Sequence, residues 1–560
     1  MKRTTPSGTP TGPRSGDVRV RRTSRRLPTL GALNAGLWLF CLGVILIPLG
    51  TVALYGLASG RLNELARADV AQAALNSVVS AVGSGVLAVL MALLLVLAIE
   101  HTTLTGRAGL RILALSPMLV PPFIGAIAWV GLFGPASYIN RAATELTGSP
   151  LWVIYGGDGV VLLLALHSYP IAYLLIAAAL ARIPAELEQA ARASGAGSRR
   201  VLGDITLPLL RTALVSSFVL VTVSNLADFG IPALIGAPRG YETLATIAYR
   251  FVRSGTVENP VQLAACVGVV LLVMVAAGML LIRLLSRRSY AVEAAYARTE
   301  PIRLRRPWIL GSVTWLLVLS LTVLPLCALM LQALLPAPGV ALSWETLTLN
   351  NFTTVLQSRW TAEGAQTSIS LALGAAAITG IVGLAIGTVV TRTQLPGRGL
   401  LRTVSLMPLA VPGLIVAIGW LLLAPHLGLF NTPWLILCAY VMSFIALVVQ
   451  AIEAPLKSTS TTLEEAARIS GASPIRAFTD VSVRLAVPAA WAGALLVFLT
   501  AVRELTISAL LLAPNAQTLG VAIFNLQQAG SFGSAAALSV IVTVVGLVGM
   551  GLITRRLRQH

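Results

Sequence analysis

The sequence predicts an all-α polytopic membrane protein in which twelve transmembrane helices form two parallel six-helix halves, related by a pseudo-two-fold axis. Composition is the first indication: 56% of the residues are hydrophobic and 11% are charged, whereas soluble globular chains carry about 25% charged residues. The second is a series of apolar runs of about 20 residues, the length that a helix needs to cross a bilayer. The third is an internal duplication. The alternating pattern of an outer-membrane barrel is absent from the sequence.

The chain divides into four parts. Residues 1–30 are rich in Pro, Gly, Ser, Thr and Arg, a composition that cannot bury a core, and we expect a disordered basic cytoplasmic tail. Residues 31–285 form the first half, 286–306 an arginine-rich cytoplasmic linker, and 307–560 the second half. The expected spans lie near 34–57, 78–99, 112–133, 159–181, 212–230, 262–285, 308–334, 368–391, 403–424, 432–453, 487–512 and 534–554.

The distribution of basic residues predicts the orientation. With the N-terminus inside, 32 Lys and Arg residues fall in cytoplasmic segments and seven fall outside. Because cytoplasmic loops carry the excess of Lys and Arg, both termini are expected in the cytoplasm. The net charge of +19 therefore reflects loop asymmetry, and no nucleic-acid partner is expected, since no basic, aromatic-rich domain stands outside the spans.

The duplication is visible in two pairs of segments. TLTGRAGLRILALSPMLVPPFIGAIAW (103–129) matches TQLPGRGLLRTVSLMPLAVPGLIVAIGW (393–420) at an offset of 291, and a polar segment between the fourth and fifth spans recurs at an offset of 276. The first half thus holds 15 extra residues, which we place in the outer loop between Gly134 and Asp158. An even number of spans in each half makes the halves parallel. The proline pairs Pro117/Pro121 and Pro408/Pro412 are expected to kink the third and ninth spans.

The polar segment reads LEQAARASGAGSRRVLGDITLPL from Leu187 and LEEAARISGASPIRAFTDVSVRL from Leu463. Helix formers follow Pro184, and Ser-Gly then breaks the helix. We expect a helix–turn–helix at the membrane surface in each half, over 184–208 and 460–484, with a small alanine face that a partner could approach.

These segments resemble the signature E-A-A-x3-G-x9-I-x-L-P of permease subunits of binding-protein-dependent ABC importers. The first copy has Gln in place of the Glu, and the second departs at the Leu-Pro end. The resemblance implies two MetI-like halves in a bacterial plasma (inner) membrane protein, with a type I importer's partners: two ATP-binding-cassette ATPase subunits, an extracytoplasmic substrate-binding protein and the lipid bilayer. It implies that ATPase coupling involves Glu188, Gln189, Ala190, Ala191, Gly195, Glu464, Glu465, Ala466, Ala467 and Gly471.

A fused two-permease chain is most similar to the ferric-iron transport permeases of that family. The segments that suggest this branch are LADFGIPALIGAP (226–238) and RELTISALLLAPNAQTLGVAIF (503–524). Thiamine and 2-aminoethylphosphonate permeases are built similarly and stay open as alternatives.

The chain is not expected to be an enzyme or to hold a cofactor. A phosphate-binding loop needs a Gly-Lys pair, and the two lysines, Lys2 and Lys457, follow Met1 and Leu456. ATP hydrolysis is therefore assigned to a separate chain. The four cysteines and four histidines lack metal-ligand spacing, and no resident metal is expected.

Charged residues inside or beside the spans are the candidates for a substrate pathway, since a charge in the bilayer usually faces a cavity or a partner. Asp228 and Glu504 are equivalent at the 276 offset, and with Asn225 and Arg503 they form the predicted pathway set. The alternative is an interfacial position, with Glu504 paired to an arginine. Glu100 and His101, which close the second span, are expected to be a solvated helix end.

Two other classes of protein compete with the importer permease. A secondary transporter can also have twelve spans in two parallel halves, but it needs coupling charges in the core, of which this chain has few. A membrane-embedded enzyme needs clustered His, Cys or carboxylate side chains, and the sequence has no such cluster.

Overall fold

A computed structural model describes residues 28–58, 60, 68–254, 258–286, 307–511 and 516–557. The described residues are helical and contain no β-strand, which confirms the all-α class. Eleven of their helices are long and apolar enough to cross a membrane, and one bent pair brings the number to twelve. The predicted tail falls on residues outside the described part, except that the first helix already begins at Pro28, and the linker lies outside it beyond Ser286.

The elements recur in the same order in both halves. The first half contains α1 (Pro28–Cys41), η1 (Leu42–Leu46), α2 (Ile47–Ala58), α3 (Ala68–Ile99), α4 (Arg107–Leu115), η3 (Ser116–Leu119), α5 (Pro122–Phe133), α6 (Tyr138–Thr147), α7 (Gly157–Leu180), α8 (Ala185–Ala193), α9 (Ser198–Val201), η4 (Leu202–Thr206), α10 (Leu207–Leu226), η5 (Pro232–Gly236), η6 (Ala237–Arg239), α11 (Leu244–Arg253) and α12 (Pro260–Ser286). The second contains α13 (Pro307–Leu334), α14 (Asn350–Gln357), α15 (Arg359–Arg392), α16 (Arg398–Leu406), η7 (Met407–Ala410), α17 (Gly413–Leu427), α18 (Pro433–Ser458), α19 (Thr462–Ile469), α20 (Pro474–Ala477), η8 (Phe478–Val483), α21 (Arg484–Val502), α22 (Thr506–Leu510), α23 (Leu519–Gln528) and α24 (Phe532–Leu557).

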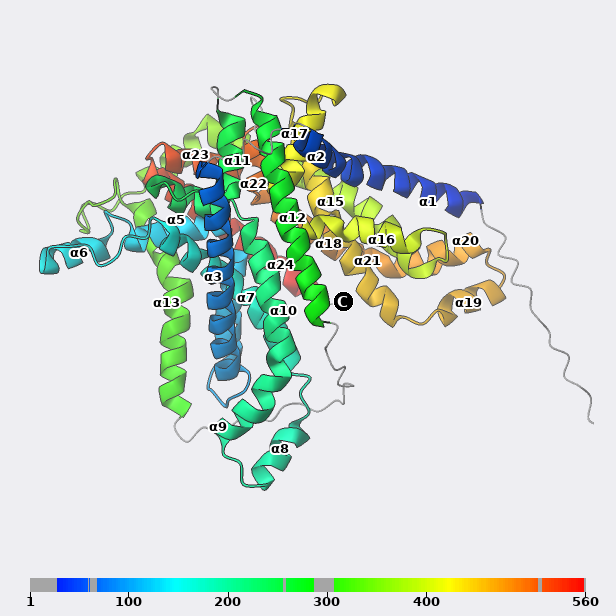
Figure 1. The fold of residues 1–560 in the computed structure, drawn as a ribbon, viewed down its shortest axis with the longest axis horizontal. Coiled ribbons are helices and arrows are strands. Elements are labelled where there is room, and N and C mark those ends of the chain that lie inside the picture. The colour runs from blue at the N-terminus through cyan, green and yellow to red at the C-terminus, as the bar shows by residue number, and fades with distance from the viewer. Residues whose placement is uncertain are drawn as a thin grey trace, which may run out of the picture.

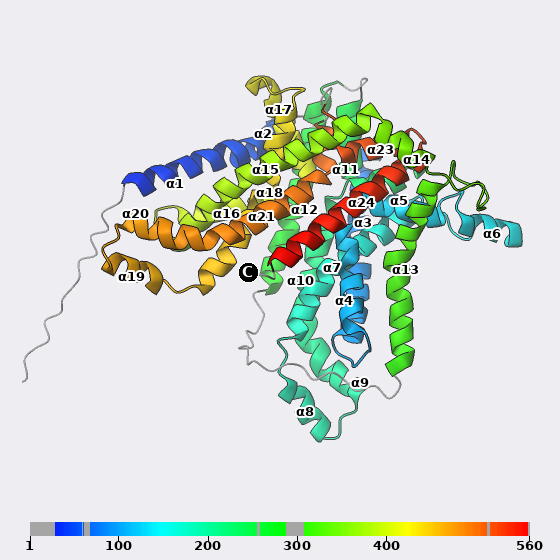
Figure 2. The same ribbon diagram turned by 180° about the vertical axis from the view of Figure 1, so that it is seen from behind.

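The two helical bundles diverge from a shared region. In Figures 1 and 2 the helices α3, α7, α10 and α13 run downward, whereas α15, α18 and α21 run to the side with α1. The short helices α11, α22 and α23 gather where the bundles meet, and α8 and α19 lie at the two free ends. The molecule therefore has the shape of an inverted V, with the duplicated polar segments far apart.

The first helix of each half packs against the other half. α2 contacts α12 of its own half and α17 of the second, and α13 contacts α24 of its own half and α5 and α4 of the first. Trp38 of α1 lies against Gly397, and Trp315 of α13 lies against Gly106. Both glycines have positive φ, 78° and 74°, which only glycine adopts at little cost. The same tryptophan–glycine contact therefore joins the two bundles at two equivalent places.

The third and ninth spans are broken helices, as the proline pairs predict. Proline lacks an N–H group and disfavours helical backbone in the residue before it, and Val120 and Val411 are extended at ψ 127° and 123°. α5 and α17 then start after Pro121 and Pro412. In the second half the two segments meet at 107°.

Two predicted spans end too late in the sequence-based assignment. α10 ends at Leu226 rather than near 230, and α21 ends at Val502 rather than near 512. Acidic side chains that bind backbone N–H groups just beyond these ends start new short helices, as described below. The returning helices α11 and α23, whose apolar faces are buried, were not predicted. The extra residues of the first half form α6, as no helix lies between α17 and α18.

Candidate functional site

The first polar segment folds as the predicted helix–turn–helix. α8 begins after Pro184, carries Glu186 and Glu188 in its first turn and Arg192 in its last, a distribution that complements the helix dipole. The helix ends in a Schellman motif: the Ala196 N–H donates to the Ala191 carbonyl, and Gly195 has a φ of +88°. The turn leads through α9 and the π-helical segment η4 into α10.

The second polar segment repeats this geometry. The Ala472 N–H donates to the Ala467 carbonyl, Gly471 has a φ of +92°, and α19 leads through α20 and the π-helical segment η8 into α21. The departures of both copies from the signature therefore leave the backbone of the turn unchanged. π-Helical turns are rare and often mark functional positions.

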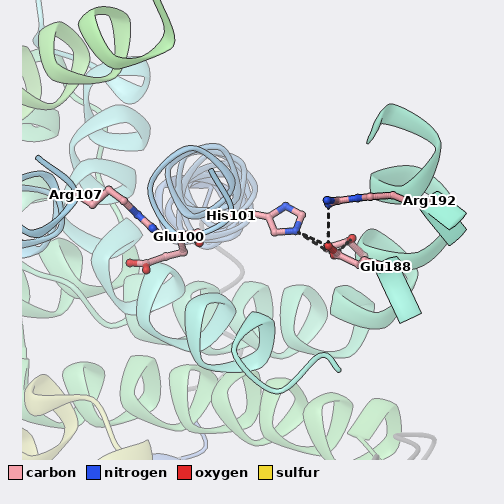
Figure 3. Close-up of polar contacts among 6 residues, drawn as sticks. Glu100, His101, Arg107, Glu188 and Arg192 are labelled. Carbon is pink, nitrogen blue, oxygen red and sulfur yellow. Dashed lines mark hydrogen bonds and ion pairs between the residues drawn. The ribbon is translucent and has the colours of Figure 1, made fainter. Parts of the chain in front are cut away.

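Glu188 points away from solvent, into the protein. Its side chain is 2% exposed, and the His101 Nε2 atom at the end of α3 lies 3.0 Å and 3.2 Å from its two carboxylate oxygens. Thr206 Oγ1 in η4 donates to Oε1 at 2.7 Å, and Arg192 Nη2 lies 3.5 Å from Oε2. Figure 3 shows His101 and Arg192 converging on Glu188.

Glu464 occupies the equivalent position in the second half. The Ser482 hydroxyl in η8 donates to Glu464 Oε1, and Arg392 Nε, at the end of α15, lies 3.7 Å from the same oxygen. Arg392 is 4% exposed and also donates to the Thr459 carbonyl that follows α18.

The expectation of a solvated end at Glu100 and His101 is wrong. His101 is 2% exposed and bonded to Glu188. Glu100 turns to the opposite side of the helix end (Figure 3), where it accepts hydrogen bonds from Arg111 and from Tyr173. Burial acts to raise the pKa of Glu100, but these hydrogen bonds and the arginine charge outweigh it and lower the pKa. Tyr173, 73 residues from Glu100, and Glu188, 87 residues from His101, thus turn this helix end into a polar junction.

The other predicted coupling residues form the outer face of each motif. Gln189, Ala190 and Gly195 are exposed, and so are Glu465, Ala466 and Gly471, whereas Ala191 and Ala467 are half-buried. Beside the first turn lies a hollow of about 370 Å³ lined by Ala191, Ser194, Gly195, Ala196, Arg200, Val201, Asp204 and Ile205. Each motif therefore presents a small-residue face outward and one glutamate inward.

Both pathway candidates of the first half have hydrogen-bond partners. Asn225 is 6% exposed; it accepts from Ser168 and donates to Ser84 Oγ at 2.8 Å, which joins α10 to α7 and α3. Asp228 Oδ1 accepts the Ile231 N–H at 2.9 Å. The assignment of these residues to a substrate pathway stays a prediction.

Glu504 and Arg503 have separate partners. Glu504 Oε1 accepts the Ile507 N–H at 2.7 Å and its Oε2 accepts the Ser508 N–H at 3.1 Å. Arg503 Nη1 donates across the interface between the halves to the Leu119 carbonyl at 2.7 Å. Among the described residues, no ion pair joins Glu504 to an arginine. Asp228 and Glu504 act as caps of the helices that follow them, and Arg503 links the halves.

Sequence reasoning missed the inner partners His101, Thr206, Arg392 and Ser482. The signal was present in the repeat: His101 and Arg392 are separated by the offset of 291, and Thr206 and Ser482 by the offset of 276. Polar residues that recur at both offsets could have been paired with the recurring Glu188 and Glu464. Across the part of the chain that the structure describes, no group of three or more His, Cys, Asp or Glu side chains could hold a metal ion.

Comparison with known proteins gives a family match in each half. The model of the family described as "Binding-protein-dependent transport system inner membrane component" matches residues 105–289 and 382–559. The ferric transport system permease protein of Actinobacillus pleuropneumoniae is 23% identical over 451 residues, or 78% of this chain and 64% of that protein. The chain thus spans slightly less than two thirds of this relative's length.

Two further relatives differ in name and coverage. A "probable ABC transporter permease protein" of Sinorhizobium fredii is 24% identical over 94% of this chain and 92% of its own length. A trehalose transport system permease protein of Mycobacterium tuberculosis is 29% identical over 38% of this chain and 80% of its own length.

Proposed function

The chain belongs to the family of binding-protein-dependent transport system inner membrane components, and we propose that it is the transmembrane permease subunit of a type I ABC importer. The observation that carries the proposal is the twin helix–turn–helix, which occurs at equivalent places in both halves with the same glycine turn and an exposed alanine face. A single polypeptide would then offer two docking sites for two ATPase subunits.

In this proposal the outer face of each motif contacts an ATPase. The residues assigned to the contact are Gln189, Ala190 and Gly195 in the first copy and Glu465, Ala466 and Gly471 in the second. Short side chains let the helix enter a groove on a partner, and the ATPases, rather than this chain, hydrolyse ATP. The lipid bilayer surrounds the spans, and an extracytoplasmic binding protein delivers the substrate to the side where α11, α22 and α23 meet.

The inverted V fits a transporter open toward the ATPase side. The coupling helices lie at the free ends of the arms while the opposite ends pack together (Figures 1 and 2). Closure of the two ATPases on ATP would bring α8 and α19 together and shift the population toward the opposite opening. With the excess of Lys and Arg in the loops that carry these helices, both termini belong in the cytoplasm of a bacterial cell.

Ferric iron is the proposed substrate. Support comes from the ferric permease relative that covers 78% of this chain, together with the fused two-half architecture. The chain's own carboxylates add no support, because Asp228 and Glu504 are engaged in helix caps. Thiamine and 2-aminoethylphosphonate are the alternative substrates.

Two measurements test the proposal. The tagged chain, expressed with a candidate ATPase and binding protein from the same organism, should copurify the ATPase and drive ATP-dependent uptake of radiolabelled ferric iron into vesicles. Uptake that persists without the ATPase and follows an ion gradient would identify a secondary transporter instead. ATP-dependent uptake of thiamine or the phosphonate, with none of iron, would keep the importer and replace the substrate.

A further inference from the structure

The two halves hold their coupling helices with equivalent glutamates but different partners. Glu188 and Glu464 precede the Gln and the Glu of the signature, point inward, and accept a hydroxyl from Thr206 and Ser482, respectively. The remaining partner comes from the end of the second span of each half: it is His101 in the first and Arg392 in the second.

We infer that Glu188 and Glu464 are positioning residues that fasten the coupling helices α8 and α19 to the ends of α3 and α15. The inference rests on the proposed function only for the name of the helices. The fastening itself is a property of the chain alone.

Burial makes the first fastening strong. A carboxylate that is 2% exposed is unfavourable unless hydrogen bonds satisfy it, and three donors reach Glu188 from three places: the end of α3, η4 and α8 itself. Moving α8 away from the junction would leave these groups unpaired, so α8, η4 and the end of α3 move as one body. A pull on α8 would then reach a helix that crosses the membrane.

Hydrogen exchange of the full-length chain in lipid nanodiscs tests the inference without an ATPase. Glu188→Gln should speed exchange of the α8 amides about tenfold, whereas Glu186→Gln, an exposed neighbour on the same helix, should leave them unchanged. Glu464→Gln should likewise speed exchange of the α19 amides, whereas Glu465→Gln, its exposed neighbour, should leave them unchanged.

Removing the partner gives the second arm. His101→Ala, which takes away the group at the end of α3 that contacts Glu188, should also speed exchange of the α8 amides. Unchanged exchange of α18 in each variant reports an intact fold. Equal exchange in Glu188→Gln and Glu186→Gln would overturn the fastening, and wild-type exchange of α8 in His101→Ala would overturn the role of His101. Failure of the wild type to copurify an ATPase would instead defeat the proposed function and leave these exchange results standing.

Discussion

Replacing Gly195 or Gly471 with alanine should disrupt ATPase coupling through the backbone alone. Both glycines have a left-handed φ, +88° and +92°, and a Cβ atom added at either would meet no heavy atom within 4 Å. The cost is therefore conformational rather than steric. An L-residue in left-handed backbone costs roughly 1–2 kcal/mol, and each 1.4 kcal/mol is about a tenfold change in an equilibrium.

The Schellman turn would accordingly be about five- to thirtyfold less favoured relative to other loop conformations. Because the turn sets the angle between α8 and α9, the outer face of the motif would be presented in the wrong orientation. We expect ATPase copurification and uptake to fall by a similar factor in Gly195→Ala, and nearly to disappear in Gly195→Leu, whose side chain also obstructs the docking face.

The same loop supplies a matched control. Gly197 has a φ of −69° and a ψ of 158°, and a Cβ atom added there also meets nothing within 4 Å. Gly197→Ala should therefore behave like the wild type. Gly195→Asn should lose less than Gly195→Ala, since asparagine enters left-handed backbone more readily than most residues.

Copurification of the ATPase, measured against the amount of folded chain, separates these outcomes. Equal losses in Gly195→Ala and Gly197→Ala would refute the conformational argument. Full coupling in Gly195→Leu would refute the assignment of this face as the docking surface.

Three further predictions concern the rest of the molecule. Trp315→Ala, which removes the contact of α13 with Gly106, should lower the free energy of unfolding in detergent by about 1–3 kcal/mol, as followed by thermal melting. An unchanged free energy of unfolding would show that other contacts hold α13 against the first half. Asn225→Ala should cost about 1–2 kcal/mol of stability through its lost interhelical hydrogen bonds, whereas loss of uptake without loss of stability would return it to the substrate pathway. The hydrogen bonds and the arginine charge that lower the pKa of Glu100 stabilise the fold above the ordinary carboxyl pKa, and this stabilisation is lost as the pH falls through the lowered pKa of Glu100. The thermal midpoint of the wild type should therefore drop more steeply below pH 4.5 than that of Glu100→Gln. Parallel curves for the two proteins would contradict this.

The sequence predicted the features that depend on local pattern. Span length, the repeat, the broken spans at Pro121 and Pro412 and the turn at Gly195 all follow from hydropathy, proline geometry and glycine placement. These features need no knowledge of which segments touch. The packing of α1 and α13 against the opposite half does require that knowledge, because nothing in the residues around Trp38 identifies Gly397 as its neighbour.

The polar partners were missed for the same reason. His101 and Glu188 are 87 residues apart in the sequence, and a histidine that follows an apolar span is typical of a solvated helix end. Likewise Asp228 and Glu504 were natural pathway candidates, because a charge beside a span is costly. The cost is offset locally by backbone N–H groups at the start of the next helix, a solution that composition does not reveal.

The halves share their backbone geometry but differ in the chemistry that stiffens them. The buried polar trio of Ser84, Ser168 and Asn225 corresponds, at the repeat offsets, to Ala375, Phe444 and Ala501. In the first half these hydrogen bonds add to the apolar packing of α3, α7 and α10, whereas the equivalent positions of α15, α18 and α21 carry apolar side chains.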